Sequence, residues 1–222
     1  MDKIFFAINS FQSTLNHRTM QALLVIDIQN DFCPGGIMEV PDGDQAVPVA
    51  NQAMKKFPLV AATQEWRPAN HKSFAANHPW RRPGDVIQLN GVEQVLWPIH
   101  CVQGSFGAEF VRELNTSLFR KVFVKGTDPE IDSYSGFYDN GRRKSTGLGE
   151  YLKEQGVKEL YILGLALDRC VKFSVLDALE LGFKTHLVID GCRGANLKPG
   201  DSDQAVSEMR EKGAIIVKAA EL

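Results

Sequence analysis

The sequence predicts one α/β domain in three layers, with a central, mostly parallel six-stranded sheet covered by helices on both faces. Two observations support this fold class. Apolar runs of strand length recur at 22–27, 58–63, 121–125, 159–163, 185–189 and 214–218. Helix-like stretches near 45–56, 147–155, 168–182 and 202–212 separate several of these runs. Alternation of this kind is typical of parallel sheets whose strands are joined by crossover helices.

Length and composition agree with a single domain of this class. The chain has 222 residues, of which 44% are hydrophobic, and this content can supply a sizeable core. We expect residues 20–222 to form the domain and residues 1–19 to be an N-terminal extension without a catalytic role. The formal charge of -2 arises from mixed signs along the chain, so no basic stripe indicates nucleic acid or an anionic membrane. A small neutral or weakly polar molecule is the expected partner.

Hydropathy and cysteine spacing narrow the class further. No apolar run approaches the roughly 18 residues of a membrane span, so we expect a soluble protein without a membrane partner. The four cysteines, Cys33, Cys101, Cys170 and Cys192, are scattered without CxxC spacing. This pattern argues against a disulfide framework and against a thiolate zinc site, and it fits a reducing, cytoplasmic compartment.

Cys170 occupies the best place in this chain for a nucleophile. A strand-like run at 159–163 precedes it, and a helix is expected over 168–182 with Asp168 as its N-cap and Gly182 as its stop. A thiol in the first turn of a helix faces unpaired N–H groups and the positive end of the helix dipole, which lower its pKa. The alternative is a small buried hydrophobic residue, the commoner role of a lone cysteine.

Two other predicted strands end in a charge that can serve this thiol, Asp27 after the first and Lys125 in the third. Because ligands bind beyond the carboxyl ends of strands in open α/β sheets, we expect both to meet Cys170 at one site. A carboxylate there can accept the thiol proton, and an ammonium stabilises the thiolate. Taken singly, Asp27 also fits an ordinary cap and Lys125 a solvated strand end. The interval 64–120 shows no clear strand, and loops this long are usually functional.

Four segments carry a specific resemblance. They read LVIDIQNDFCPGG at 24–36, WPIHCVQG at 97–104, KGTDPEIDSYSGF at 125–137 and GLALDRCVKF at 164–173. In this order they resemble bacterial and fungal nicotinamidases, within the isochorismatase-like cysteine hydrolases, and the match runs from about Gln21 to the C-terminus.

The resemblance implies a catalytic triad. In it Asp27 takes the proton of Cys170, Lys125 orients both, and the thiolate attacks the carboxamide carbon of nicotinamide. Ammonia leaves from a thioacyl enzyme that water then hydrolyses, while the backbone N–H groups of Ala166 and Cys170 bind the oxyanion. The family also places a cis peptide at the position of Leu165-Ala166.

Aromatic residues are expected to hold the pyridine ring. Phe32, Trp97, Tyr134 and Phe137 match the positions that form this wall in nicotinamidases. From composition alone the same residues fit an ordinary aromatic core equally well.

The chain departs from its family where nicotinamidases bind a divalent metal. The family pattern is Asp-x-His before a Pro-x-x-His stretch, together with the histidine of Trp-Pro-x-His. Here the segment 65–74 reads EWRPANHKSF, so Glu65 replaces the aspartate and Arg67 replaces a histidine ligand, while His100 is retained. Arginine stays protonated and offers no lone pair, so one ligand is missing.

Three outcomes of this departure are compatible with the sequence. In the first, His71 joins Glu65 and His100 in a rebuilt site for zinc, or for iron or manganese. In the second, Arg67 occupies the place of the metal and favours a substrate that carries a carboxylate. In the third, the site is impaired. Leu167, where the family commonly has threonine, also removes a hydroxyl beside the nucleophile.

The expected function is therefore a cytoplasmic nicotinamidase that feeds nicotinic acid into NAD salvage and also hydrolyses pyrazinamide, with zinc as the first choice of metal. One rival, which Arg67 suggests, is a related hydrolase of a small acidic amide, or of an enol ether, with little metal dependence. A second rival is a catalytically impaired ligand-binding protein. Family members occur as monomers and as larger assemblies, so a homo-oligomer stays open.

Overall fold

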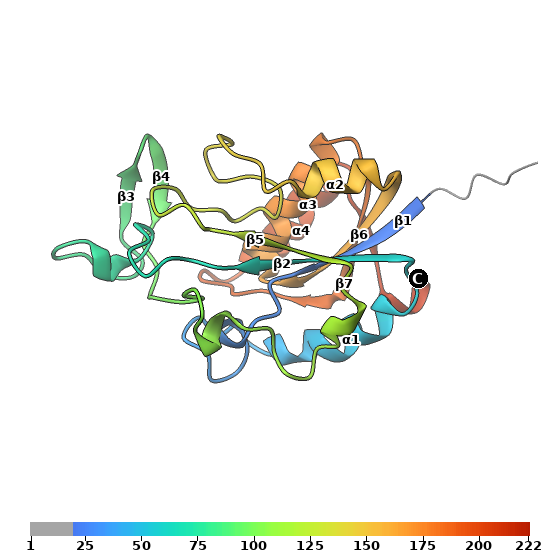
Figure 1. Ribbon diagram of the computed structural model, residues 1–222, viewed down its shortest axis with the longest axis horizontal. Coiled ribbons are helices and arrows are strands. Elements are labelled where there is room, and N and C mark those ends of the chain that lie inside the picture. Colours follow the sequence, from blue (N-terminus) through green and yellow to red (C-terminus); the bar gives the residue numbers. More distant parts are fainter. Residues whose placement is uncertain (1–19) are drawn as a thin grey trace, which may run out of the picture.

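The structure, a computed structural model, describes residues 20–222 and is built on the predicted six-stranded parallel sheet (Figure 1). The strands follow one another across the sheet in the order β5-β2-β1-β6-β7-β8. Their bounds are β1 Met20–Ile26, β2 Leu59–Glu65, β5 Lys121–Lys125, β6 Val157–Leu165, β7 Lys184–Arg193 and β8 Ile215–Val217. All of its strand pairs are parallel, so the predicted fold class is confirmed. The expected extension, 1–19, lies outside the described residues.

Strand β1 is one of the two central strands of the sheet, and its carboxyl end sets the position of Asp27. Its residues from Ala22 to Ile26 are buried, as a strand covered on both faces requires. At its carboxyl end Ile26 pairs with Thr63 of β2 on one side and with Gly164 of β6 on the other. Asp27 therefore leaves the sheet between the ends of these two neighbours.

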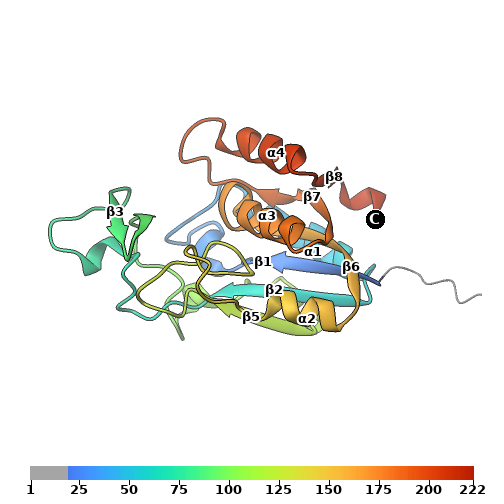
Figure 2. The same ribbon diagram turned by 90° about the horizontal axis from the view of Figure 1, so that it is seen from above.

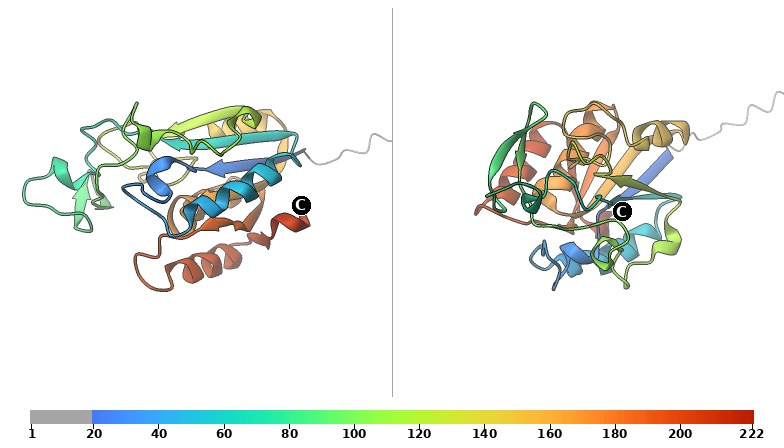
Figure 3. Two further views of the ribbon diagram at one scale, coloured as in Figure 1. Left: turned by 90° about the horizontal axis from the view of Figure 1, so that it is seen from below. Right: turned by 60° about the vertical axis from the view of Figure 1, so that its left-hand side comes forward.

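Helices cover both faces of the sheet. They are α1 Ala46–Met54, α2 Leu148–Glu154, α3 Lys172–Glu180 and α4 Asp201–Glu211, each inside or within a residue of its expected stretch. Helix α1 lies on one face, whereas α2 and α3 lie on the other with α4 beside α3 (Figures 1 and 3). Right-handed crossovers in opposite directions from the centre of a sheet place helices in this way.

The interval 64–120 contains a hairpin, so the expectation of no strand there is wrong. Strands β3, Val86–Leu89, and β4, Val92–Val95, pair antiparallel around Asn90-Gly91. Asn-Gly between short apolar alternations is the strongest short-range hairpin signal, and it is present in the sequence. Figure 2 shows the hairpin beyond the carboxyl ends of the parallel strands, where a site is expected.

The described helices are short. In residues 20–222 none combines the length and the apolar character needed to cross a membrane.

Candidate active site

Cys170 lies where strand β6 passes into helix α3. A π-helical segment, Leu167–Val171, joins the two elements and carries the cysteine, which is buried. The peptide bond Leu165–Ala166 is cis, at the position that the resemblance implies. Asp168 does not cap this helix as expected. Its buried carboxylate instead accepts hydrogen bonds from the backbone N–H groups of Ala195, at 2.9 Å, and Asn196, at 2.8 Å.

Asp27 and Lys125 meet at this thiol. The Lys125 Nζ lies 2.8 Å from Asp27 Oδ2 and 3.5 Å from Cys170 Sγ. The hydroxyl of Thr63, in the neighbouring strand, donates to Asp27 Oδ1 at 2.7 Å. All these side chains are buried, so the three residues predicted for the site do come together.

Glu65 is a second carboxylate at the thiol. It is the last residue of β2 and pairs with Lys125 in the register of β2 and β5. Its Oε1 lies 2.9 Å from Lys125 Nζ and 3.5 Å from Cys170 Sγ. The amide of Gln29 fixes the backbone here, accepting from the Glu65 N–H and donating to the Glu65 carbonyl.

The electrostatics distinguish the two carboxylates. Burial raises the pKa of Asp27 above its usual value, although Lys125 opposes this effect. Burial would also raise the pKa of Glu65, but the charges of Arg67 and Lys125 outweigh it and hold that pKa well below its usual range. A carboxylate with a higher pKa is the stronger base, which favours Asp27 as the acceptor of the thiol proton, whereas the hydrogen bond of the Cys170 thiol itself is to Glu65 Oε1.

Cys170 is a thiol at rest, which corrects the expectation of a depressed pKa. Burial raises the pKa of Cys170 well above its usual value, and Lys125 only partly opposes this. Desolvation thus outweighs the dipole of the helix start. For Lys125, burial alone would lower the pKa, but Asp27, Cys170 and Glu65 raise it well above its usual value. The site therefore keeps a permanent ammonium beside a neutral thiol.

Arg67 lies in a closed network of acceptors next to Glu65. Its Nη2 is 3.1 Å from Glu65 Oε1, and its Nε donates to Glu65 Oε2 at 3.2 Å. Its Nη1 donates to Ser73 Oγ at 3.1 Å and to Asp132 Oδ1. The side chain is 1% exposed. Burial would lower the pKa of Arg67, but Asp132 and Glu65 raise it well above its usual value, so the guanidinium is a fixed cation.

Two of the three predicted metal ligands, Glu65 and His100, contact each other, and the third, His71, has a different partner. His100 places Nε2 3.1 Å from Glu65 Oε2 and Nδ1 2.8 Å from the Pro98 carbonyl. His71 accepts at Nδ1 from the N–H of Ser73 at 3.0 Å. Burial, helped by Arg67, lowers the pKa of His71 to about 4, so the neutral ring carries its proton on Nε2. Among the described residues, His71 Nε2 is buried without a hydrogen-bond partner. While Nδ1 accepts from Ser73, Nε2 carries the proton and offers no lone pair to a metal.

In residues 20–222 one group of side chains could supply three close ligands to a divalent ion, and it differs from the predicted one. It consists of Asp27, Glu65 and Cys170, whose ligand atoms lie within 4.8 Å of one another. The Lys125 ammonium lies 2.8, 2.9 and 3.5 Å from these three residues. A cation already stands where the metal would bind, so this group does not fit an additional ion.

An apolar pocket opens onto the thiol. Phe32, Trp97 and Tyr134 line it as predicted, and Trp97 Nε1 donates to the Tyr134 hydroxyl at 3.3 Å. Phe137 is not part of this wall, contrary to the expectation. It is buried in the core, where its ring is tilted by 30° to that of Phe183 at 6.4 Å between centroids.

The pocket has further walls that the sequence analysis did not identify. They are Met38, Val40, Arg169, Ala195 and Leu197. Asp132 was also missed as a partner of Arg67, and Gln94 of the hairpin donates to it at 3.0 Å. In the sequence, the signal for Asp132 was its place inside the 125–137 segment. Its pairing with Arg67 could not be predicted, because the two residues lie 65 positions apart in the chain.

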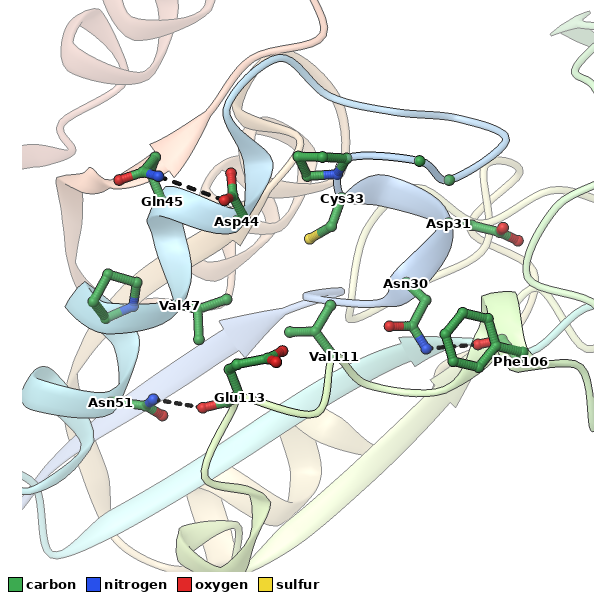
Figure 4. A pocket seen from close by; sticks show the side chains of 14 residues that line it. Asn30, Asp31, Cys33, Asp44, Gln45, Val47, Asn51, Phe106, Val111 and Glu113 are labelled. Carbon is green, nitrogen blue, oxygen red and sulfur yellow. Dashed lines mark hydrogen bonds between the residues drawn. The ribbon is translucent and has the colours of Figure 1, made fainter.

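A wider cavity of about 670 Å³ lies on the other side of the 30–36 loop (Figure 4). Cys33 lines it near Asp44 and Glu113. Burial, with help from these two carboxylates, raises the pKa of Cys33 to about 11. With no cation beside this thiol among its described neighbours, the cavity lacks the pairing found at Cys170.

This chain is similar in sequence and in structure to several known proteins. The isochorismatase domain matches residues 21–221. The chain is 48% identical over 205 residues to the nicotinamidase of Escherichia coli, covering 90% of this chain and 96% of that relative. It is 42% identical to a solved nicotinamidase/pyrazinamidase of Acinetobacter baumanii, with a TM-score of 0.88 and coverage of 92% and 99%. A pyrazinamidase of Pyrococcus horikoshii, solved in complex with zinc, is 38% identical, with a TM-score of 0.72 and coverage of 89% and 98%.

Proposed function

Since this chain belongs to the isochorismatase family, we propose that it is a nicotinamidase, which hydrolyses nicotinamide to nicotinic acid and ammonia. The observation that carries this proposal is the buried cluster of Asp27, Lys125 and Cys170 at the end of an aromatic pocket. Nicotinamidases of known sequence, at up to 48% identity over most of the chain, support the substrate. Pyrazinamide, a similar flat carboxamide, is the expected second substrate.

Catalysis begins when substrate enters and the thiol proton of Cys170 moves to Asp27. The sulfur attacks the carboxamide carbon, and the carbonyl electron pair moves to oxygen, where the backbone N–H groups of Ala166 and Cys170 receive it. The Lys125 ammonium stabilises sulfur while it is negative and holds Asp27 in place.

Ammonia leaves when the tetrahedral intermediate collapses. Asp27 returns its proton to the departing nitrogen, and a thioester to Cys170 remains. Asp27 then takes a proton from water, whose oxygen attacks the thioester carbon. Nicotinic acid leaves, and the sulfur recovers its proton from Asp27.

The aromatic side chains of the pocket agree with a flat, aromatic substrate. Phe32, Trp97 and Tyr134 offer ring surfaces against which a pyridine can stack. Burial raises the pKa of Tyr134, so its hydroxyl stays neutral and can donate a hydrogen bond.

The rival with an acidic substrate depended on a free Arg67. The guanidinium forks onto Glu65 and also binds Asp132, which leaves no second fork for a substrate carboxylate. The rival of an impaired protein is opposed by the complete Asp27, Lys125 and Cys170 cluster. Four cysteines without a disulfide support the proposed cytoplasmic location.

Zinc, iron or manganese on Glu65, His71 and His100 was the expected cofactor, and a zinc-bound relative supports a divalent metal in the family. The residues of this chain do not fit that group. Both oxygens of Glu65 bind Arg67, and the acceptor nitrogen of His71 already binds the Ser73 N–H. No catalytic step here is assigned to a metal.

The experiment that tests the proposed function is ammonia release from nicotinamide by the purified chain, with Cys170→Ala as the blank. Release by the parent chain and none by the variant would support it. Turnover that survives in Cys170→Ala, or no turnover of nicotinamide and pyrazinamide by a folded parent, would refute it.

A further inference from the structure

The departure at 65 and 67 forms one unit in the folded chain. Glu65 is the last residue of β2. Arg67 follows two residues later, and its guanidinium contacts the Glu65 carboxylate. A parallel fork onto both oxygens is the strongest geometry that arginine makes with a carboxylate. The glutamate and the arginine therefore form a matched pair in this structure.

The rest of the fold fixes the guanidinium in this place. The backbone of Arg67 donates to the Cys101 carbonyl at 2.9 Å and accepts from the Gln103 N–H at 2.8 Å. Asp132 binds the far side of the guanidinium, and Gln94 and the Ser133 N–H hold Asp132 in turn.

Space for the side chain comes from a glycine. Gly126 follows Lys125 with φ of +68°, and a Cβ there would lie 3.2 Å from Arg67 Cγ. The segment that follows β5 thus fits closely against an arginine at position 67.

Arg67 supplies a positive charge at Glu65, as a bound metal ion would. Arg67 is a permanent cation that touches Glu65, which in turn touches Lys125 and His100. A cation placed there neutralises Glu65 and keeps it in contact with the lysine that serves the thiol.

We propose that this chain works without a bound divalent metal, and that Arg67 takes the place of the ion as a positioning residue acting through Glu65. The inference rests on the proposed amide hydrolysis for its catalytic part only. Its structural part concerns metal binding and can be tested without a substrate.

The first measurement is the metal content of the full chain, purified without chelator from cells supplied with zinc, iron and manganese. We expect far less than one ion per chain by mass spectrometry and no saturable zinc binding by calorimetry. Ammonia release should be unchanged after treatment with a chelator. One tightly bound ion per chain, whose removal stops turnover and whose return restores it, would overturn the proposal and support Glu65, His71 and His100 as ligands.

A matched variant tests whether the Glu65–Arg67 pair is what excludes the metal. Glu65→Asp with Arg67→His replaces the pair by a shorter carboxylate and an imidazole, both ordinary ligands. We expect this double variant to bind cobalt or zinc and to show the visible absorption of bound cobalt. His71→Ala and His100→Ala in the double variant then identify the remaining ligands. A folded double variant that binds no metal would contradict the proposal that Arg67 excludes the metal. If the double variant does not fold, the metal content of the parent chain decides.

Two single substitutions separate positioning from packing. Arg67→Lys keeps the charge, whereas Arg67→Gln replaces it by a shorter, neutral polar side chain. We expect kcat to fall by more than tenfold in Arg67→Gln with little change in KM, and to be partly preserved in Arg67→Lys. Equal losses in both variants would reduce Arg67 to a packing role. A parent chain that holds no metal and releases no ammonia would refute the proposed function and leave the inference on metal binding intact.

Discussion

The ammonium of Lys125 lies 2.9 Å from the carboxylate of Glu65, its partner in the register between β5 and β2. The same nitrogen lies 2.8 Å from Asp27, so one buried cation serves two buried carboxylates. This sharing gives Lys125 a structural role beside its catalytic one, because an unpaired buried charge is costly.

Lys125→Met is therefore expected to lower the free energy of unfolding by about 3–5 kcal/mol and to abolish turnover. The loss arises from the carboxylates that remain buried without their cation. Urea denaturation at neutral pH measures it. Adding Asp27→Asn to Lys125→Met should recover part of the stability without recovering activity. Additive losses in the double variant would contradict the coupling.

Asp27→Asn keeps the shape of the side chain and removes its basicity. We expect kcat/KM for nicotinamide to fall by about 10²–10⁴-fold, the usual contribution of a general base. Steady-state ammonia release measures the loss, with circular dichroism as the control for folding. Glu65→Gln is the comparison, and a larger loss there than in Asp27→Asn would transfer the role of base to Glu65.

The raised pKa of Cys170 predicts slow alkylation in the absence of substrate. An exposed cysteine has a pKa of about 8.5 and reacts through its thiolate. Because burial raises the pKa of Cys170 well above that range, its rate with iodoacetamide should be low at pH 7 and still rising above pH 9. Peptide mapping distinguishes Cys170 from the other three thiols. A rate that levels off below pH 8 would show a depressed pKa instead.

Phe32 and Phe137 allow the same substitution at a pocket wall and in the core. Phe32→Leu should raise KM for nicotinamide several-fold because it removes ring surface from the pocket. Phe137→Leu should leave KM unchanged and lower the free energy of unfolding by on the order of 1–2 kcal/mol through lost core packing. Kinetics and urea denaturation of both variants check this, and a raised KM in Phe137→Leu would return that residue to the substrate wall.

Asp168 connects the segment at Ala195 and Asn196 to the turn that carries Cys170. Asp168→Ala removes the acceptor of two backbone N–H groups, those of Ala195 and Asn196, and should cost about 1.5–3 kcal/mol of stability. Because Ala195 lines the pocket, KM should rise as well. Asp190→Ala is the control, since Asp190 accepts from the Ala219 N–H away from the pocket. Equal kinetic effects in the two variants would argue against this link.

Much of the fold and of the catalytic cluster could be predicted because both depend on local patterns. The buried runs of β1 and β6 are continuous and apolar, and the carboxyl ends of parallel strands meet at one edge. Strand direction therefore places Asp27, Lys125 and Cys170 at one edge of the sheet, and the strand order β5-β2-β1-β6 brings them together. The hairpin was missed although its Asn90-Gly91 turn is written in the sequence.

Other assignments depended on packing that no local pattern records. Asp168 has the residue type of an N-cap, yet its carboxylate binds a segment 27 and 28 residues away. Phe137 has the residue type of a pocket wall, yet it faces the core. The pKa of Cys170 depends on its complete burial more than on the helix start.

By itself, the sequence determined the parallel sheet and placed Asp27, Lys125 and Cys170 at one edge of it, since alternating apolar runs and strand direction are local properties. Only the tertiary structure decided what Arg67 does. Its partners come from β2, from Ser73 and from Asp132, 65 residues further on. A buried charge takes its role from the groups that surround it, and those groups are adjacent only in the folded chain.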